Sequence, residues 1–291
     1  MRLTASALPI AALFASIAGI PVAHATAPED ISISGLMTYG GVALDQDAAT
    51  GQFDALALEL GSAIANKPWA PARTLGTAGF DLSFGTTFVL IDTNDDEDGT
   101  PSPWAAGHNA EDPANMLIMP TLSMRKGLPL SFEMGARASW LAGSRQGVIS
   151  GFLRAAPVEG YKPWPDLTFQ IGYSGYVGND ELELGVLDIG GSVGGTFAFG
   201  SLPGIRQAQV SPYIGGGVLV VHAAAVLDDD TSAAMFGPPA GDDDPSQRSY
   251  PVVPQVAAGI QVTNSTVLFR LAGTWTPSTA PSIHVGMGFA Y

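Results

Sequence analysis

Cysteine is absent from this 291-residue chain, and the absence excludes several chemistries at once. Without cysteine the protein has no disulfide, no cysteine-ligated zinc site and no thiol nucleophile. The absence also suits a compartment in which unpaired thiols are a hazard.

Positive charge and long apolar runs are scarce as well. The 12 Lys and Arg residues against 27 Asp and Glu residues give a formal net charge of −15. A chain this acidic binds nucleic-acid phosphates poorly, so we expect no nucleic-acid partner. Beyond residue 25 no stretch offers the roughly 18 uninterrupted apolar residues of a spanning helix. Yet 46% of residues are hydrophobic and only 13% are charged, and 36 Gly and 22 Pro favour strands and turns.

The first 25 residues are typical of a secretory signal peptide. Arg2 supplies the positive start, an apolar stretch runs from about Ala5 to Val22, and Ala23-His24-Ala25 fits the cleavage site. We therefore expect residues 1–25 to be removed and the mature chain to be exported.

From about Phe80 onward, large apolar residues alternate with small or polar ones. Period two is the mark of a strand whose two faces meet different surroundings. Aromatic residues at segment ends, as at Trp140, Tyr173 and Trp275, resemble the interface girdles of membrane barrels. We predict ten strands, at residues 78–91, 115–125, 129–142, 146–156, 165–177, 181–198, 207–226, 250–262, 265–275 and 282–291.

The connections between these predicted strands alternate in length. The first and seventh, 92–114 and 227–249, are each 23 residues long, whereas the even-numbered connections are short. A membrane barrel has long loops outside and short turns on the periplasmic side. The two long loops hold 13 of the 27 acidic residues, which predicts an acidic outer mouth. The basic stretches MRKGLP and PGIRQ fall at predicted periplasmic turns.

In hydrocarbon every backbone N–H and C=O group must be paired internally, and only helices and closed barrels achieve this. Since a spanning helix is excluded by length, an apolar face in lipid forces closure. We predict an all-β fold over residues 78–291: a transmembrane antiparallel up-and-down β-barrel of about ten strands (8–12), with a short N-terminal helical segment. The final strand must then pair with the first.

That final strand, SIHVGMGFAY, places large residues on one face and stops on an aromatic ring. The residues are Ile283, Val285, Met287, Phe289 and Tyr291. This pattern resembles the C-terminal strand of the Gram-negative outer-membrane β-barrel superfamily, which includes porin-like proteins. The resemblance implies a place in the cell outer membrane, contact with its lipids, and recognition of this strand by the barrel-assembly machinery.

The segment at residues 26–77 does not follow the strand pattern. Phe53, Leu56, Leu60 and Ile64 have helical spacing, which predicts a short helix at about 52–66. The segment either plugs the lumen, caps the periplasmic end or lies in the membrane interface, and residues 31–44 could add a strand. An N-terminal segment of about 50 residues before a barrel is also similar to FadL-type transporters with an N-terminal hatch.

The inward face of the barrel carries charges of both signs. The candidate lumen-lining residues are Asp81, Glu133, Arg137, Arg154, Asp188 and Arg270. They either line a polar channel or form a salt-bridged filling. About eight strands leave a filled interior and about 16–18 an aqueous channel, so ten strands disfavour a wide diffusion porin and leave a narrow pore open.

Two motifs suggest other chemistry. Asn94, Asp96 and Asp98 match the early positions of a calcium loop, but Ala105 stands where the bidentate Glu is needed; a solvated acidic loop is the alternative. GGSVG at 190–194 fits a nucleophile elbow around Ser192, with His222 or His284 as candidate bases. A nucleophile elbow needs a strand-to-helix turn, and this motif lies inside a strand.

Three functions follow from these patterns. The first is a narrow channel or transporter for small solutes, with the inward charges setting selectivity. The second is a structural or surface-interaction barrel with a closed lumen, which acts through the acidic loops. The third is a membrane-embedded hydrolase. We expect a protein without a cofactor, and not an enzyme.

Overall fold

The computed structural model describes residues 27, 29–37, 46–91, 93, 102–108, 114–161, 164–199, 208–237, 247–277, 279 and 281–291. The predicted signal peptide at 1–25 and the calcium candidates Asn94, Asp96 and Asp98 lie outside these residues. None of the helices in the described ranges is both long and apolar enough to span a bilayer.

Twelve strands and four short helices make up the described chain. The strands are β1 (Phe80–Leu90), β2 (Met116–Leu128), β3 (Phe132–Trp140), β4 (Gly147–Val158), β5 (Asp166–Val177), β6 (Leu182–Gly194), β7 (Phe197–Phe199), β8 (Ala208–Ala225), β9 (Gln247–Ser249), β10 (Val252–Asn264), β11 (Val267–Trp275) and β12 (Ser282–Ala290). The helices are η1 (Ser34–Met37), α2 (Gln46–Ile64), α3 (Pro103–Ala106) and α4 (Asp229–Phe236).

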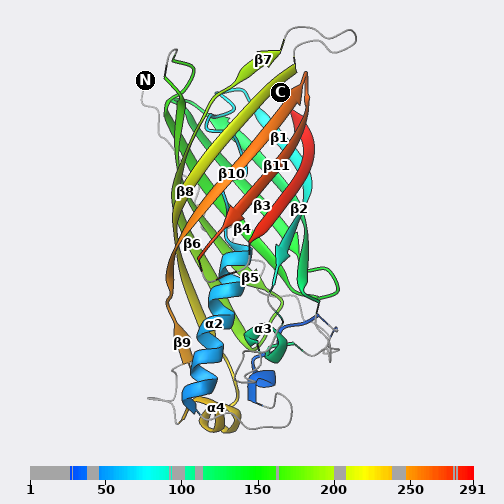
Figure 1. The fold of residues 1–291 in the computed structure, drawn as a ribbon, viewed down its shortest axis with the longest axis vertical. Coiled ribbons are helices and arrows are strands. Elements are labelled where there is room, and N and C mark those ends of the chain that lie inside the picture. The colour runs from blue at the N-terminus through cyan, green and yellow to red at the C-terminus, as the bar shows by residue number, and fades with distance from the viewer. Residues whose placement is uncertain are drawn as a thin grey trace, which may run out of the picture.

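Ten strands form a closed antiparallel barrel, as the alternation predicts. Each long strand pairs with the next along the chain, β8 also pairs with β10, and β12 pairs with β1 to close the sheet (Figure 1). At the seam Phe80 N donates to Tyr291 O at 2.8 Å, and Tyr291 N donates to Phe80 O at 3.0 Å. The last strand therefore closes the barrel against the first, which confirms that part of the fold prediction.

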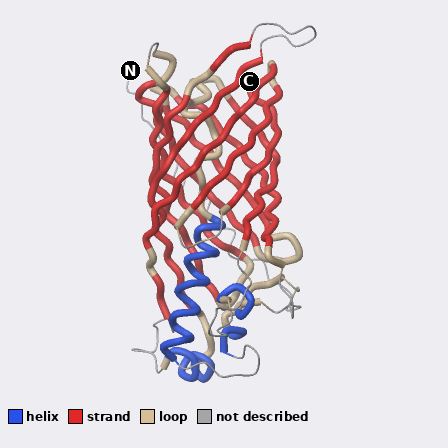
Figure 2. The backbone as a smooth tube through the Cα atoms, in the orientation of Figure 1, coloured by secondary structure: helices blue, strands red, loops and turns tan. Residues whose placement is uncertain are grey.

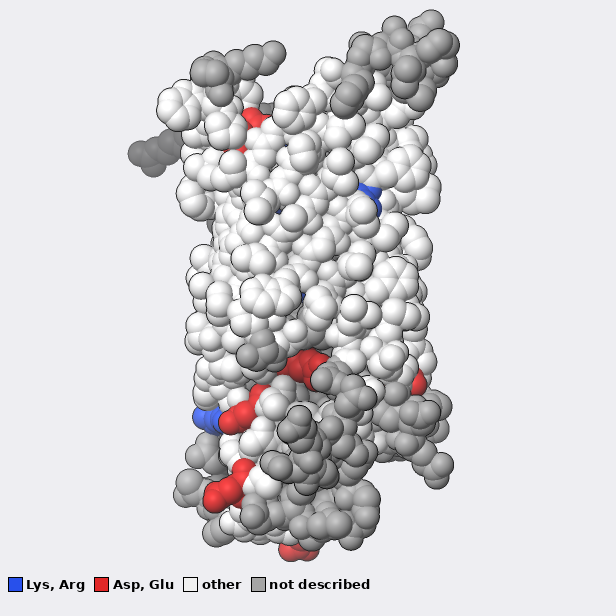
Figure 3. Space-filling model, in the orientation of Figure 1, with Lys and Arg blue, Asp and Glu red and all other residues white. Residues whose placement is uncertain are grey.

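The outer wall of the barrel is apolar. Side chains such as Phe84, Ile171 and Phe269, about half exposed, alternate along the long strands with buried inward residues, which are mostly polar toward one end of the barrel and apolar toward the other. Figure 3 shows an uncharged band around the visible face of the barrel, with most of the Asp and Glu side chains in view gathered toward the helical end. A hydrophobic surface this large is far beyond what single soluble domains normally expose.

The structure differs from the predictions at several elements, of which the following are the clearest. The predicted strand at 181–198 is broken: β6 ends at Gly194, and β7 begins at Phe197 and pairs only with β8. The predicted strand at 115–125 continues to Leu128, because the pairing with β3 runs on to Leu128 opposite Phe132. In place of an extra strand at 31–44, the described residues 29–37 contain η1 and a single bridge between Ile31 and His108.

All the helices lie at one end of the barrel, which we name the long-loop end (Figure 2). It carries the connections 91–115, 141–146, 178–181, 226–251 and 276–281; the opposite end, with the connections 129–131, 159–165, 195–207 and 265–266, is the short-turn end. Helix α2 begins at Gln46 and ends at Ile64. Residues 65–79, named the lumen segment, then run inside the wall to the start of β1 at the short-turn end (Figure 1).

Candidate functional site: the lumen and its filling

The six candidate lumen-lining residues are all buried inside the barrel. Asp81, Glu133, Arg137, Arg154, Asp188 and Arg270 are each 7% exposed or less. They come from five strands, β1, β3, β4, β6 and β11, and their inward direction follows from the strand period of two. The structure therefore brings together, across strands, charges that lie far apart in the sequence.

Five of the charged side chains near the short-turn end form one network, named the charged layer. Its members are Asp81, Arg125, Glu133, Arg154 and Arg270. Asp81 accepts hydrogen bonds from Arg125 and Arg270, Arg125 Nη1 also bonds Glu133 Oε1 at 3.1 Å, and Arg154 Nη1 lies 3.7 Å from the same oxygen. Buried charges are tolerated only when they are paired and hydrogen-bonded in this way.

The lumen segment is held by side chains of the wall that bond its backbone. Gln170 Nε2 donates to Asn66 O at 2.9 Å, Arg137 Nη2 donates to Lys67 O at 2.9 Å, and Arg154 Nη1 donates to Pro71 O at 3.3 Å. These donors belong to strands β5, β3 and β4, so the segment is fastened to several strands at once.

Side chains of the lumen segment also contact the wall. Lys67, 1% exposed, donates from Nζ to Ser282 Oγ at 2.8 Å. The Trp69 ring stacks on His284, with centroids 4.1 Å apart and planes at 7°. The Arg137 guanidinium lies 4.4 Å from the centroid of the Trp69 ring, a cation–π distance. A cavity of about 10 Å³ lies between Pro68 and the wall, which is the space of about one water molecule.

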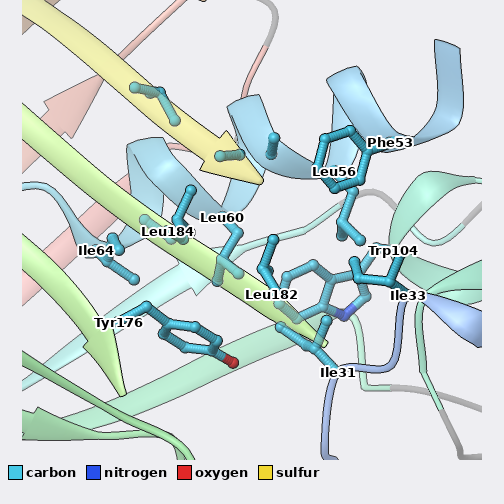
Figure 4. Packing of buried hydrophobic residues seen from close by; sticks show 14 of the residues in the cluster. Ile31, Ile33, Phe53, Leu56, Leu60, Ile64, Trp104, Tyr176, Leu182 and Leu184 are labelled. Carbon is cyan, nitrogen blue, oxygen red and sulfur yellow. The ribbon is translucent and has the colours of Figure 1, made fainter. Parts of the chain in front are cut away.

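At the long-loop end, the filling is apolar. Phe53, Leu56 and Leu60 of α2 are 0–1% exposed and pack in one cluster with Leu182 and Leu184 of β6 (Figure 4). We name the buried apolar residues of α2 and the strand residues they touch the helical layer. Trp104 of α3 and Ile33 lie in the same cluster, so the N-terminal segment and the long first connection pack together at this end.

The beginning of the described chain is anchored at the long-loop end. Asp30 accepts hydrogen bonds from Ala27 N at 2.7 Å, Ser144 Oγ at 2.8 Å and Arg145 N at 2.9 Å, and pairs with the Arg145 guanidinium at 3.3 Å. Burial alone would raise the pKa of Asp30, but these hydrogen bonds and the Arg145 charge outweigh it and lower that pKa below its ordinary value.

Two further contacts fasten this region. Glu181 accepts hydrogen bonds from Ser32 Oγ at 3.0 Å and Ser34 N at 2.9 Å. Burial lowers the pKa of His108, against the opposing effects of its bond to Trp104 O and of the carboxylates of Glu29 and Asp30. The neutral form of the His108 imidazole is therefore favoured beside Trp104.

The candidate nucleophile and the candidate bases of a hydrolase have separate partners. Ser192 Oγ shares a hydrogen bond of 2.7 Å with Thr168 Oγ1, toward the short-turn end of the β5–β6 pair. His284 Nδ1 lies 3.2 Å from Thr87 Oγ1 and its ring faces Trp69, while His222 packs beside Tyr250. In the part of the chain that the structure describes, Ser192 is hydrogen-bonded to Thr168 and to neither of the two candidate histidines.

Several residues of the lumen, among them Arg125, Lys67 and Trp69, are not among the sequence candidates. The basic stretch that contains Arg125 falls at a predicted periplasmic turn, although Thr121, Ser123 and Arg125 alternate as inward residues of β2, and that alternation could have found it. Lys67 and Trp69 lie in an irregular segment rich in proline. No periodicity marks such a segment, so the sequence carried no signal for them.

Comparison with known proteins finds similar solved structures but no match by sequence. No family model and no curated protein matches the chain. Ail of Yersinia pestis, solved with the heparin analogue sucrose octasulfate, superposes with a TM-score of 0.29 at 9% identity, covering 74% of this chain and 99% of that one. Neisserial surface protein A superposes with a TM-score of 0.30 at 13% identity, covering 72% of this chain and 95% of that one. Outer membrane phospholipase A from Escherichia coli superposes with a TM-score of 0.31 at 9% identity, covering 81% of this chain and 97% of that one. Likenesses at this level carry no functional argument, and the barrel assignment rests on the strand pairing of the chain itself.

Proposed function

We propose that this protein is an outer-membrane β-barrel with a closed lumen, which acts through its long-loop end as a structural or surface-interaction protein. The placement in a membrane is supported by the apolar outer wall and by the closure of the sheet, because a barrel leaves no unpaired backbone toward lipid. The orientation follows the usual one, with long loops outside.

The observation that carries the closed lumen is the course of the lumen segment. Arg137, Arg154 and Gln170 hold its backbone at 2.9–3.3 Å inside the wall, between the charged layer and the helical layer. In this proposal residues 65–79 act as a built-in plug, and three of the six buried charged candidates, Glu133, Arg137 and Arg154, bond its backbone. The long-loop end is then the part of the molecule that is left to meet a partner.

Planar-bilayer recording tests the closed lumen. We expect the inserted full chain to be electrically silent, and the double variant Lys67→Ala with Trp69→Ala to show intermittent conductance because the plug has lost two side-chain anchors. Steady conductance of the unmodified chain would contradict the proposal. Sidedness is tested by epitope tags on intact cells: a tag after Gly237 should be accessible to antibody, and a tag at Leu130 should not.

A gated channel for small solutes is the second candidate, and one observation favours it. The wall holds the plug largely through the backbone carbonyls of Asn66, Lys67 and Pro71, and water can replace such hydrogen bonds. In that case Asp81, Glu133 and Arg270 would line the opened path and set its selectivity. Reversible conductance in urea below the unfolding range would support gating, and silence up to the unfolding of the barrel would exclude it.

A further inference from the structure

The Trp69 ring of the lumen segment has a flat partner on each of two strands. The imidazole of His284, on β12, stacks on it with the centroids 4.1 Å apart and the planes at 7°. The guanidinium of Arg137, on β3, lies 4.4 Å from the centroid of the Trp69 ring. All three side chains are 7% exposed or less. The contacts are therefore made away from water, where a cation–π contact is strongest.

The same contacts continue to the far wall of the barrel. Arg137 Cζ also lies 5.4 Å from the centroid of the Phe152 ring, on β4. The four side chains of His284, Trp69, Arg137 and Phe152, which we name the transverse stack, thus run from β12 to β4. In the closed sheet these strands are separated by β1, β2 and β3 in one direction and by β5, β6, β8, β10 and β11 in the other. The stack therefore crosses the lumen close to a diameter.

Glycine in the wall makes room for both ends of the transverse stack. A Cβ atom at Gly85 would come within 2.6 Å of His284 Cε1, and one at Gly135 would overlap the Phe152 ring. Neither glycine has a positive φ, so glycine is needed here for space and not for backbone conformation. Thr87 Oγ1 lies 3.2 Å from His284 Nδ1 and orients that ring further. Both ends of the stack thus lie close against the wall.

Arg137 contacts the lumen segment in two ways at once. Its Nη2 donates to Lys67 O at 2.9 Å, while its guanidinium carbon lies over the ring of Trp69, two residues further along. A planar guanidinium can make both contacts, because its hydrogen bonds lie in its plane and its ring contacts lie above that plane. Of the four members of the stack, Trp69 is the one that belongs to the plug.

We propose that the transverse stack is the gate of the lumen: the plug stays in place because His284 and Arg137 hold the ring of Trp69, and the lumen opens when that ring withdraws. The proposal rests on the closed lumen proposed above and names the part that regulates it. Water can replace the hydrogen bonds to the plug backbone. It cannot replace the contacts of the ring, because a withdrawn ring exposes apolar surface and loses a desolvated cation–π contact.

Planar-bilayer recording of two variants at residue 69 tests the gate. Trp69→Leu keeps an apolar side chain but removes the flat ring, whereas Trp69→Phe keeps a ring that can stack. We expect the leucine variant to open at least about tenfold more often than the phenylalanine variant, because it alone loses every ring contact. Equal opening of the two variants, with both barrels folded by gel mobility, would overturn the gate.

A substitution in the wall reaches the stack without changing the plug. In Gly135→Ala the added methyl group displaces the Phe152 ring from its place on the wall, and we expect more frequent opening. Gly151→Ala is the matched control: it adds the same group on β4, where a Cβ would meet only Gly135 O at 3.7 Å, and it should stay closed. If Gly135→Ala does not refold, Phe152→Leu removes the same end of the stack and should open in its place.

Fluorine NMR of protein labelled with fluorotryptophan reports on the ring directly. The resonance of Trp69, assigned through Trp69→Phe, should shift in Gly135→Ala or Phe152→Leu and stay unchanged in Gly151→Ala. An unchanged Trp69 resonance in the stack variants would refute the gate.

The unmodified chain keeps the two proposals apart. Steady conductance of the unmodified chain refutes the closed lumen and the gate together. A silent unmodified chain, with Trp69→Leu no more open than Trp69→Phe, refutes the gate alone and leaves the closed lumen standing.

Discussion

Toward its long-loop end the lumen of the barrel is filled by apolar contacts of a helix, and toward its short-turn end it is filled by buried ion pairs. In the helical layer Leu60 and Phe53 are 0% exposed and pack against the wall without directional bonds. In the charged layer Asp81 and Glu133 are equally buried but bind three arginines. The same wall thus supports two kinds of filling.

The difference has an energetic consequence. An apolar contact that is lost leaves a cavity whose cost depends on how far the site can collapse. A buried charge that loses its partner leaves an uncompensated ion, which costs more than the pair itself contributed. The charged layer should therefore be the less tolerant of single substitutions, and the helical layer the more adaptable.

The largest effect is expected at the centre of the charged layer. Asp81→Ala removes the carboxylate shared by Arg125 and Arg270, and we expect the free energy of unfolding to fall by about 3–5 kcal/mol. Urea unfolding of the refolded barrel, followed by its gel mobility, measures this loss. Glu183→Ala, an exposed carboxylate on β6, is the control and should change stability by less than about 0.5 kcal/mol. Equal midpoints for the two variants would refute the argument.

A second substitution tests the helical layer. Leu60→Ala empties a fully buried position in α2, and we expect a loss of about 2–5 kcal/mol, seen first as protease cleavage of α2 while the barrel stays folded. Leu58→Ala deletes the same atoms from the same helix at a half-buried position and should have a smaller effect. If both variants were cleaved at the same rate, α2 would not be held by this face.

Combining the two changes sharpens the comparison. If the layers are independent, the free energy of unfolding of the double variant Asp81→Ala with Leu60→Ala should fall by the sum of the decreases in the two single variants, within about 0.5 kcal/mol. The unfolding midpoints of all four proteins give this value. A larger deviation would mean that the lumen segment couples the two ends.

The smallest effect concerns pH at the long-loop rim. Because the pKa of Asp30 is lowered in the folded protein, its contacts contribute stability above its unfolded pKa of about 3.9, and this contribution is lost as the pH falls through the lower folded value. We expect the beginning of the chain to detach below about pH 4, measured by the mobility of a spin label at residue 29. Asp30→Asn should remove this pH dependence, and an unchanged profile would assign the transition to another group.

Much of the fold could be predicted from the sequence, and less of the site. The six inward charges were found because the period of two assigns every strand residue to one face. The alternation does not predict their partners, because Arg125 falls at a predicted turn and Lys67 and Trp69 belong to no repeating pattern. The prediction of a narrow channel rests on the number of strands. Strand number sets the width of a barrel, but it does not indicate what fills the lumen.

The amino-acid pattern alone is enough to predict that the chain forms strands, which face of each strand is apolar, and that the sheet closes. Alternation is a property of neighbouring residues, and closure follows from the need to pair every backbone group in lipid. The folded structure is needed to show that residues 65–79 run through the lumen, from the apolar helical layer past the charged layer. Contacts such as Gln170 with Asn66 or Arg154 with Pro71 join residues 104 and 83 positions apart, and alternation along a strand does not indicate what lies across the lumen from it.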